Sequence, residues 1–222
     1  MPKPKYSPPW YEARVPAGTY RSLLKWGDPG VTKHPNSAMV RMLMDTFSMG
    51  CDEFVVPTDL ALDKVDIEIP SPVDSGDLEF MNRTVGTENV HTDTYTRIDR
   101  SYGGGMIDAL RLRRHIIENL PDCVVAPRSQ SEIEAIVRYC NDRNLAIYIY
   151  GGGSSVTRGF EAVKGGVCLD LSGHMNRVVR FSEIDQTITV EAGMSGPQLE
   201  EILNQAPERL GAKRRYTCGH FP

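Results

Sequence analysis

The ten residues YGGGSSVTRG at positions 150–159 place three glycines and two serines directly after the apolar run LAIYIY. Glycine adopts positive φ angles without steric strain and lets a backbone approach another molecule closely. Successive amides of such a run can form a concave nest for an anion, and Ser154 and Ser155 add hydroxyl donors at its rim. We expect Val156 to anchor this loop in apolar packing. A tight turn between two strands accounts for the glycines equally well, so their number alone leaves both interpretations open.

The two commonest nucleotide-binding signatures are absent from this loop. It matches neither G-x-G-x-x-G nor G-x-x-x-x-G-K-[ST]. A second run, SYGGG at 101–105, follows a polar segment instead of an apolar one. We therefore interpret the second run as a structural lead-in to a helix.

The glycine loop lies within an alternation of apolar runs and helical patterns. We expect strands at 122–127, 145–150 (buried), 166–171, 176–181 and 187–192, and helices at 39–47, 109–120, 131–143 and 195–204. Pro121 should close the second helix, Ser129 or Ser131 should cap the third, and Ser195 should cap the fourth. Strand, helix and strand between 122 and 150 predict a right-handed crossover between parallel neighbours. The later strands add antiparallel pairing, so the pattern indicates an α+β fold and not a doubly wound nicotinamide domain.

Composition narrows the classes of partner. The chain of 222 residues suffices for one sizeable domain or two small ones, and its net charge of −4 gives no global reason to expect nucleic acid or an anionic membrane. Five cysteines without a C-x-x-C pair indicate reduced thiols, with neither a disulfide framework nor a metal site. The N-terminus lacks an apolar signal region, and no run of about 18 apolar residues is present. We expect a cytoplasmic protein without a transmembrane segment.

The segments PDCVVAP, LAIYIYGGGSSVTRG, VCLDLSGHMNRVV, TITVEAGMSGPQLEEIL and TCGHFP follow one another in an order that is specific. This series resembles the FAD-binding PCMH-type domain of the vanillyl-alcohol oxidase family, and most of all its alkyldihydroxyacetonephosphate synthases and bacterial FAD-linked oxidases. The resemblance is close over 97–222, and LLKWGD at 23–28 is a fainter similarity to a tryptophan-glycine opening. It implies an incomplete PCMH-type domain at 106–222, truncated at its C-terminal side, after a mostly helical and irregular region at 1–105.

The resemblance also implies which residues hold the cofactor. In that family, backbone amides of the loop wrap the FAD pyrophosphate, and a second segment near the flavin follows the last motif. The cofactor-binding residues implied here are Ile149, Tyr150, Gly151, Gly152, Gly153, Ser154, Ser155, Val156, Gly219, His220 and Pro222. Ile149 stands where proline is usual, and Ser154 where threonine is usual. Because no histidine lies between Tyr148 and Phe160, where some relatives attach FAD covalently, we expect non-covalent FAD.

Other polar residues have simpler interpretations. We expect His220 to shape the approach to the cofactor, His174 to occupy a turn, and Asp170 to make structural hydrogen bonds. The helix start after Glu191 could face an anion, but most helix N-termini bind only their own cap. The basic run at 213–215 suits either a phosphate-bearing substrate or a solvated loop.

The resemblance implies an FAD-linked oxidase or dehydrogenase, or an alkylglycerone-phosphate synthase-like enzyme of ether-lipid synthesis, acting on a small molecule or lipid precursor. We expect the chain to be a fragment lacking the substrate domain, with unknown catalytic residues beyond Pro222. The alternative is a non-catalytic FAD-binding module that needs a partner chain; a nicotinamide-dependent reductase ranks last. A homodimer is a candidate assembly, and a eukaryotic ether-lipid synthase would be peroxisomal.

Overall fold

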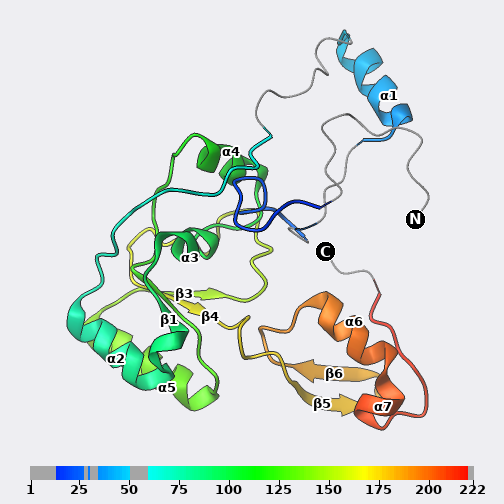
Figure 1. Cartoon of the computed structure of the whole chain (residues 1–222). Helices are drawn as coiled ribbons and strands as arrows, with labels where there is room; N and C mark the ends of the chain where they lie inside the picture. The colour runs from blue at the N-terminus through cyan, green and yellow to red at the C-terminus, as the bar shows by residue number, and fades with distance from the viewer. Residues whose placement is uncertain (1–13, 28–29, 31–34, 51–59, 220–222) are drawn as a thin grey trace.

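The computed structural model describes residues 14–27, 30, 35–50 and 60–219 (Figure 1). Its helices are α1 Ser37–Phe47, α2 Ser75–Val85, the 3-10 turn η2 Thr87–Asn89, α3 Thr94–Asp99, α4 Met106–Arg113, α5 Gln130–Arg143, α6 Gly196–Asn204 and α7 Ala206–Leu210. Its strands are β1 Val90–His91, β2 Cys123–Val125, β3 Ile147–Tyr150, β4 Val167–Asp170, β5 Val178–Ser182 and β6 Thr187–Val190. The predicted mixture of helices with parallel and antiparallel strands is confirmed.

Four short strands form the main sheet in the order β1-β2-β4-β3. β4 pairs in parallel with both β2 and β3, while β1 adds to β2 in antiparallel orientation. The expected β-α-β unit from β2 through α5 to β3 is present, but its strands are not neighbours. The prediction of adjacent pairing was wrong because β4, from later in the chain, inserts between them.

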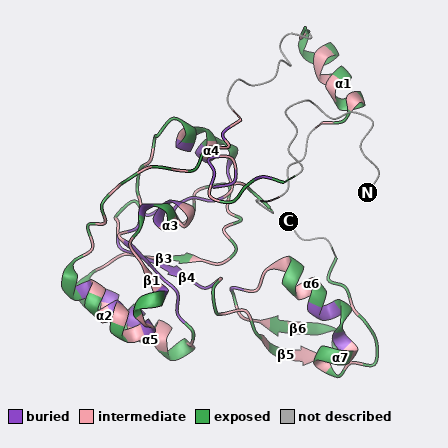
Figure 2. Ribbon diagram, viewed as in Figure 1, coloured by how far each residue is buried: buried purple, intermediate pink, exposed green. Residues whose placement is uncertain are grey.

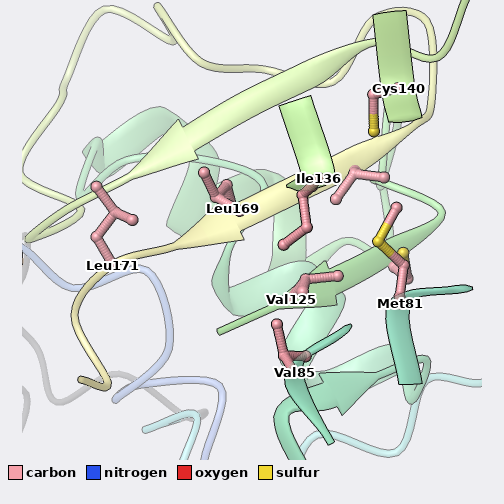
Figure 3. Packing of buried hydrophobic residues seen from close by; sticks show 9 residues of the cluster. Met81, Val85, Val125, Ile136, Cys140, Leu169 and Leu171 are labelled. Carbon is pink, nitrogen blue, oxygen red and sulfur yellow. The ribbon is translucent and has the colours of Figure 1, made fainter. Parts of the chain in front are cut away.

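The hydrophobic core lies between this sheet and the helices α2 and α5, which run side by side in Figure 1. Met81 and Val85 from α2 meet Ile136 and Cys140 from α5 over the strand residue Leu169 (Figure 3). Burial of such side chains stabilises the fold by about 1.5–3 kcal/mol each. Figure 2 shows buried residues on α2 and β4, and further buried residues around α3 and α4.

The position of β4 in the sheet decides which strand is buried. β4 is central and buried along its whole length, whereas β3 is an edge strand with intermediate and exposed residues. The run at 145–150 was therefore wrongly predicted as buried. Its apolar composition resembles that of a central strand, but only the strand order decides which strand is covered on both sides.

Capping residues define the ends of the helices that flank the glycine loop. The Ser129 side chain accepts a hydrogen bond from the Glu132 amide at the start of α5, and Asn144 ends this helix in the left-handed conformation. Ser195 and Gln198 form a reciprocal capping box at the start of α6. Such caps stabilise a helix by about 1 kcal/mol. Both predicted caps are confirmed.

The hairpin of β5 and β6 forms a separate two-stranded sheet, beside which α6 and α7 lie (Figure 1). Phe181 of β5 contacts Tyr216 edge-on, with ring centres 5.7 Å apart. The Arg177 guanidinium forms an ion pair with Glu191, 2.7 Å from nitrogen to oxygen. The first contact joins the hairpin to the stretch after α7, and the second joins the residue before β5 to the residue after β6.

The expected helix at 109–120 is wrong in its second half. α4 ends at Arg113, and His115 and Asn119 have φ angles of 56° and 57°. Ile117 and Leu120 instead pack from an irregular segment against a second core cluster that contains Leu23, Leu24, Ile98, Tyr102 and Leu112. Tertiary packing of these apolar residues overrides the helical periodicity that they share in sequence.

The region before residue 105 contributes more to the sheet than its sequence suggests. β1 pairs with β2, and α2 packs against α5, although neither element was predicted. The helix expected at 39–47 is present as α1, which has no buried residue and lies apart from the sheet in Figure 1. None of the described helices combines the length and the hydrophobicity that a bilayer crossing requires.

Candidate cofactor site

The glycine loop begins where the edge strand β3 ends. Gly153 has a φ of +63°, and a Cβ atom at this position would overlap the Tyr150 hydroxyl. At Gly151 a Cβ would lie 3.0 Å from the Ala192 carbonyl oxygen. Both the positive φ and the nearby Tyr150 hydroxyl favour glycine at position 153. The loop therefore folds tightly over Tyr150 and beside the segment before α6.

The backbone amides of this loop are not used internally. Across the described part of the chain, no amide of residues 151–156 donates a hydrogen bond to a backbone carbonyl. An inward-turned loop would have satisfied these donors with peptide oxygens, because unpaired donors away from water are costly. The amides are therefore available to an external acceptor.

A cavity of about 760 Å³ lies against the loop. This volume falls within the range of roughly 300–1,000 Å³ that is usual for small-molecule and cofactor sites. Its wall is built from three parts of the chain: residues 150 and 152–154 of the loop, residues 194–197 at the start of α6, and an N-terminal group comprising Ser22, Leu24, Lys25, Trp26, Gly27, Asp99, Tyr102, Gly103 and Gly104.

Arg100 packs against Tyr150, the residue directly before the three glycines of the loop. Its Nε donates a hydrogen bond of 2.7 Å to Asp170 Oδ2, its Nη1 pairs with Asp99, and its guanidinium carbon lies 4.5 Å from the centre of the Tyr150 ring. Burial lowers the pKa of Arg100, but the charges of Asp170 and Asp99 more than offset this, so its pKa is raised overall. The cation therefore remains charged beneath the tyrosine.

Burial also sets the ionisation of the groups around Arg100. It raises the pKa of Tyr150 to about 12, so the phenol stays protonated at neutral pH. It likewise raises the pKa of the Asp99 carboxyl, an effect that the nearby Arg100 partly offsets. Asp170 is buried and also accepts hydrogen bonds from the amide and hydroxyl of Ser172. These contacts agree with the structural role expected for Asp170.

The cofactor-binding residues predicted at 149–156 divide into three groups. Tyr150, Gly152, Gly153 and Ser154 line the cavity, whereas Gly151 and Ser155 lie in the same loop outside its lining. Ile149 and Val156 are 60% and 59% exposed and are not part of the cavity wall. The expectation that Val156 anchors the loop in apolar packing was wrong, since Tyr150 holds the loop instead.

The second predicted segment is only partly described. Gly219 is exposed and has a φ of +88°, while His220 and Pro222 lie outside the described residues. Glu200 of α6 holds the preceding stretch, accepting hydrogen bonds of 2.9 Å from both the amide and the thiol of Cys218.

Of the remaining sequence candidates, the helix start after Glu191 contributes residues 194–197 to the cavity wall, whereas His174 and the basic run lie away from it. His174 occupies a turn, where its Nε2 is 2.8 Å from Asn89 Oδ1. The basic run at 213–215 is exposed, and the Lys213 amide donates a hydrogen bond to Glu183. In the described residues there is no cluster of three or more His, Cys, Asp or Glu side chains that could hold a metal ion.

Sequence reasoning missed the N-terminal part of the wall. Two signals pointed to it: the faint similarity of LLKWGD, which contains Trp26, and the second triple-glycine run. Gly105 caps the start of α4, as the lead-in interpretation required. Gly103 and Gly104, however, line the cavity, which periodicity in sequence does not indicate.

Comparisons with known proteins agree with this geometry. The FAD binding domain family matches residues 121–218. An alkyldihydroxyacetonephosphate synthase of Dictyostelium discoideum is 30% identical over 127 residues, which are 56% of this chain and 21% of the relative. A mitochondrial cytochrome-linked D-lactate dehydrogenase of Arabidopsis thaliana is 40% identical over 91 residues, which are 41% of this chain and 16% of the relative.

A solved alkyldihydroxyacetonephosphate synthase superimposes with a TM-score of 0.58 and 27% identity, covering 62% of this chain and 28% of the synthase. The chain thus spans about a quarter or less of the length of these relatives. The matched residues include the glycine loop, the turn beside it and α6. Through residues 121–218, the chain is similar to the FAD binding domain family.

Proposed function

We propose that the glycine loop binds the pyrophosphate of FAD through its backbone amides. The observation that carries this proposal is the set of amides at residues 151–156 that have no backbone acceptor among the described residues and lie beside a cavity of cofactor size. Aligned peptide donors stabilise phosphate without needing a lysine or arginine in the loop. The Ser154 hydroxyl adds a further donor at the cavity wall.

We further propose that FAD is held non-covalently. The described residues of the cavity wall include neither histidine nor cysteine. The phenol of Tyr150, with its pKa raised to about 12, is a poor nucleophile at neutral pH. Precipitation of the loaded protein with acid should therefore release all of the flavin into the supernatant.

For the whole protein, we propose an FAD-dependent enzyme of the group that contains the D-lactate dehydrogenases and alkyldihydroxyacetonephosphate synthases. Bound FAD supplies the electron-accepting ring system on which such enzymes rely. Within this chain, the loop and the start of α6 would fix the position of the cofactor. The proposed division into residues 1–105 and 106–222 is crossed by the contact of α2 with α5 and by the Arg100–Asp170 pair.

A pair of aspartate substitutions tests the binding proposal. Gly152 and Gly159 both have open space at the Cβ position, but only Gly152 lines the cavity. Gly152→Asp should place a carboxylate near the phosphates and weaken FAD binding at least tenfold by repulsion. Gly159→Asp should leave the dissociation constant within about twofold, because its charge lies outside the cavity.

Calorimetric titration of the full chain with FAD measures both variants, and the unfolding midpoint of each shows whether it folds. A parent chain that takes up no FAD would sink the proposal. So would equal affinity of the Gly152→Asp and Gly159→Asp variants, since the loop would then not contact the phosphates.

A further inference from the structure

The cavity wall includes a tryptophan outside the segment that matches the FAD binding domain family. Trp26 lies before residue 121, its side chain is 46% exposed, and it contributes to the same wall as Gly152 and Gly153. An indole ring that is half exposed at a cofactor-sized cavity can stack on a planar aromatic ring system. Trp26 therefore lies where its ring can stack on a planar group of a bound ligand.

The chain before Trp26 is firmly held. Leu23 and Leu24 are buried in the second core cluster, with exposed fractions of 2% and 7%. The turn that carries them is closed by a hydrogen bond of 3.0 Å from the Thr19 amide to Ser22 Oγ, and Tyr20 donates a hydrogen bond of 2.8 Å to Asp66. Trp26 thus follows two residues after a buried anchor.

The second triple-glycine run, at 103–105, contacts both the segment of Trp26 and the glycine loop. A Cβ atom at Gly104 would lie 2.6 Å from Trp26 Cα, and one at Gly103 would overlap the Ser155 carbonyl. One dipeptide therefore touches the tryptophan segment on one side and the glycine loop on the other. Any side chain at either position would push the corresponding wall away.

The neighbouring Tyr102 fixes this dipeptide. Its ring is buried, its hydroxyl accepts a hydrogen bond of 2.8 Å from the Glu118 amide, and the Arg158 guanidinium lies 5.2 Å from its ring centre. The spacing between Trp26 and the glycine loop is thus set by Tyr102, which precedes the segment matched by the family, and by Arg158, which lies within it.

From this geometry we infer that Trp26 is a ring-stacking contact for the dinucleotide, held in place by Gly103 and Gly104. The inference rests on the proposed binding of FAD and adds a residue to it. FAD carries two aromatic ends, adenine and the flavin ring, and both offer the same stacking chemistry. The experiment therefore includes each half of the molecule separately.

Trp26 can serve as its own probe. The chain has two tryptophans, and Trp10→Phe leaves Trp26 as the single one. In this background we expect FAD to quench Trp26 fluorescence with a saturable curve that matches calorimetry. Quenching by ADP assigns the adenine end to Trp26, and quenching by FMN assigns the flavin end.

Affinity gives an independent measurement. Trp26→Ala should weaken FAD binding about tenfold to a hundredfold, in line with the effect of removing an aromatic platform, while Trp26→Phe should retain most of the affinity. Gly104→Ala should also weaken binding, but should add little in a Trp26→Ala background, because both changes remove the same contact. Gly159→Ala, which meets open space, is the matched control.

The outcomes separate this inference from the proposed function. If FAD binds the parent chain but Trp26→Ala keeps the same dissociation constant, the stacking role is overturned while the loop proposal stands. If the losses of FAD affinity caused by Trp26→Ala and Gly104→Ala add up in the double variant, the inference that Gly104 holds Trp26 in place is overturned. If the parent chain binds no FAD, both proposals fail together.

Discussion

The guanidinium of Arg100 lies against the ring of Tyr150, 4.5 Å from its centre, and the hydroxyl of the same tyrosine lies under Gly153 of the loop. Tyr150 also meets Phe160 edge-on, with ring centres 5.6 Å apart. The tyrosine thus lies between the partly buried Arg100 cation and the glycine loop. A change at Arg100 should therefore reach the cofactor without any direct contact.

Arg100→Met should destabilise the fold by about 3 kcal/mol, because it leaves the buried carboxylate of Asp170 and the partly buried carboxylate of Asp99 without their counterion. The side chains of Arg100 and Asp170 are only 22% and 9% exposed. Urea unfolding measures the loss. Arg177→Met removes an ion pair with an exposed arginine and should cost less than about 1 kcal/mol. Equal losses in the two variants would contradict the special role of the buried pair.

Gly153→Ala should weaken FAD binding about tenfold or more, because its φ of +63° and the Tyr150 hydroxyl leave no room for a methyl group. Gly159→Ala, in the same segment, meets open space and should bind FAD like the parent chain. Titration calorimetry at matched protein stability distinguishes the two. Unchanged affinity in Gly153→Ala would mean that the loop conformation is not needed for binding.

Glu200 should contribute stability that is lost in acid. Hydrogen bonds from the Cys218 thiol, Thr217 and the Cys218 amide lower its pKa from 4.5 to about 2. Because the folded pKa lies below the unfolded one, this contribution is present above about pH 4.5 and is lost as the pH falls through 2. Glu200→Gln should flatten the fall of the unfolding midpoint in this window.

Glu201→Gln, one residue further along α6, is the control for that measurement and should leave the acid profile unchanged. Identical profiles for Glu200→Gln and the parent chain would show that the segment at 217–219 is not held by this carboxylate in solution.

The buried thiols should resist alkylation while the chain is folded. Burial raises the pKa of Cys123 and of Cys168 to about 12, and that of Cys140 to about 11, so little thiolate forms near pH 8. Exposed Cys218 should react before them, though slowly, because partial burial and Glu200 raise its pKa to about 11. Peptide mapping after iodoacetamide treatment measures this order, and rapid labelling of Cys123 in the folded chain would contradict it.

The sequence by itself determined the local elements around the loop. The N-caps at Ser195 and at Ser129, the latter as one of two candidates, and the antiparallel pairing of β5 and β6 were predicted, because each depends on residues close together in the chain. The position of the glycine loop after a strand follows from the same local pattern. The order of motifs also indicated the similarity to FAD binding domains that the comparison found over residues 121–218.

Tertiary structure alone decided which residues meet at the loop. Strand order made β4 central and left β3 at the edge, since a long-range pairing and not local propensity chooses neighbours. Packing of Ile117 and Leu120 ended α4 early. Arg100 and Trp26 reach the site from segments far from the glycine loop in sequence, because an ion pair and a close glycine contact form only when distant parts of the chain fold against each other.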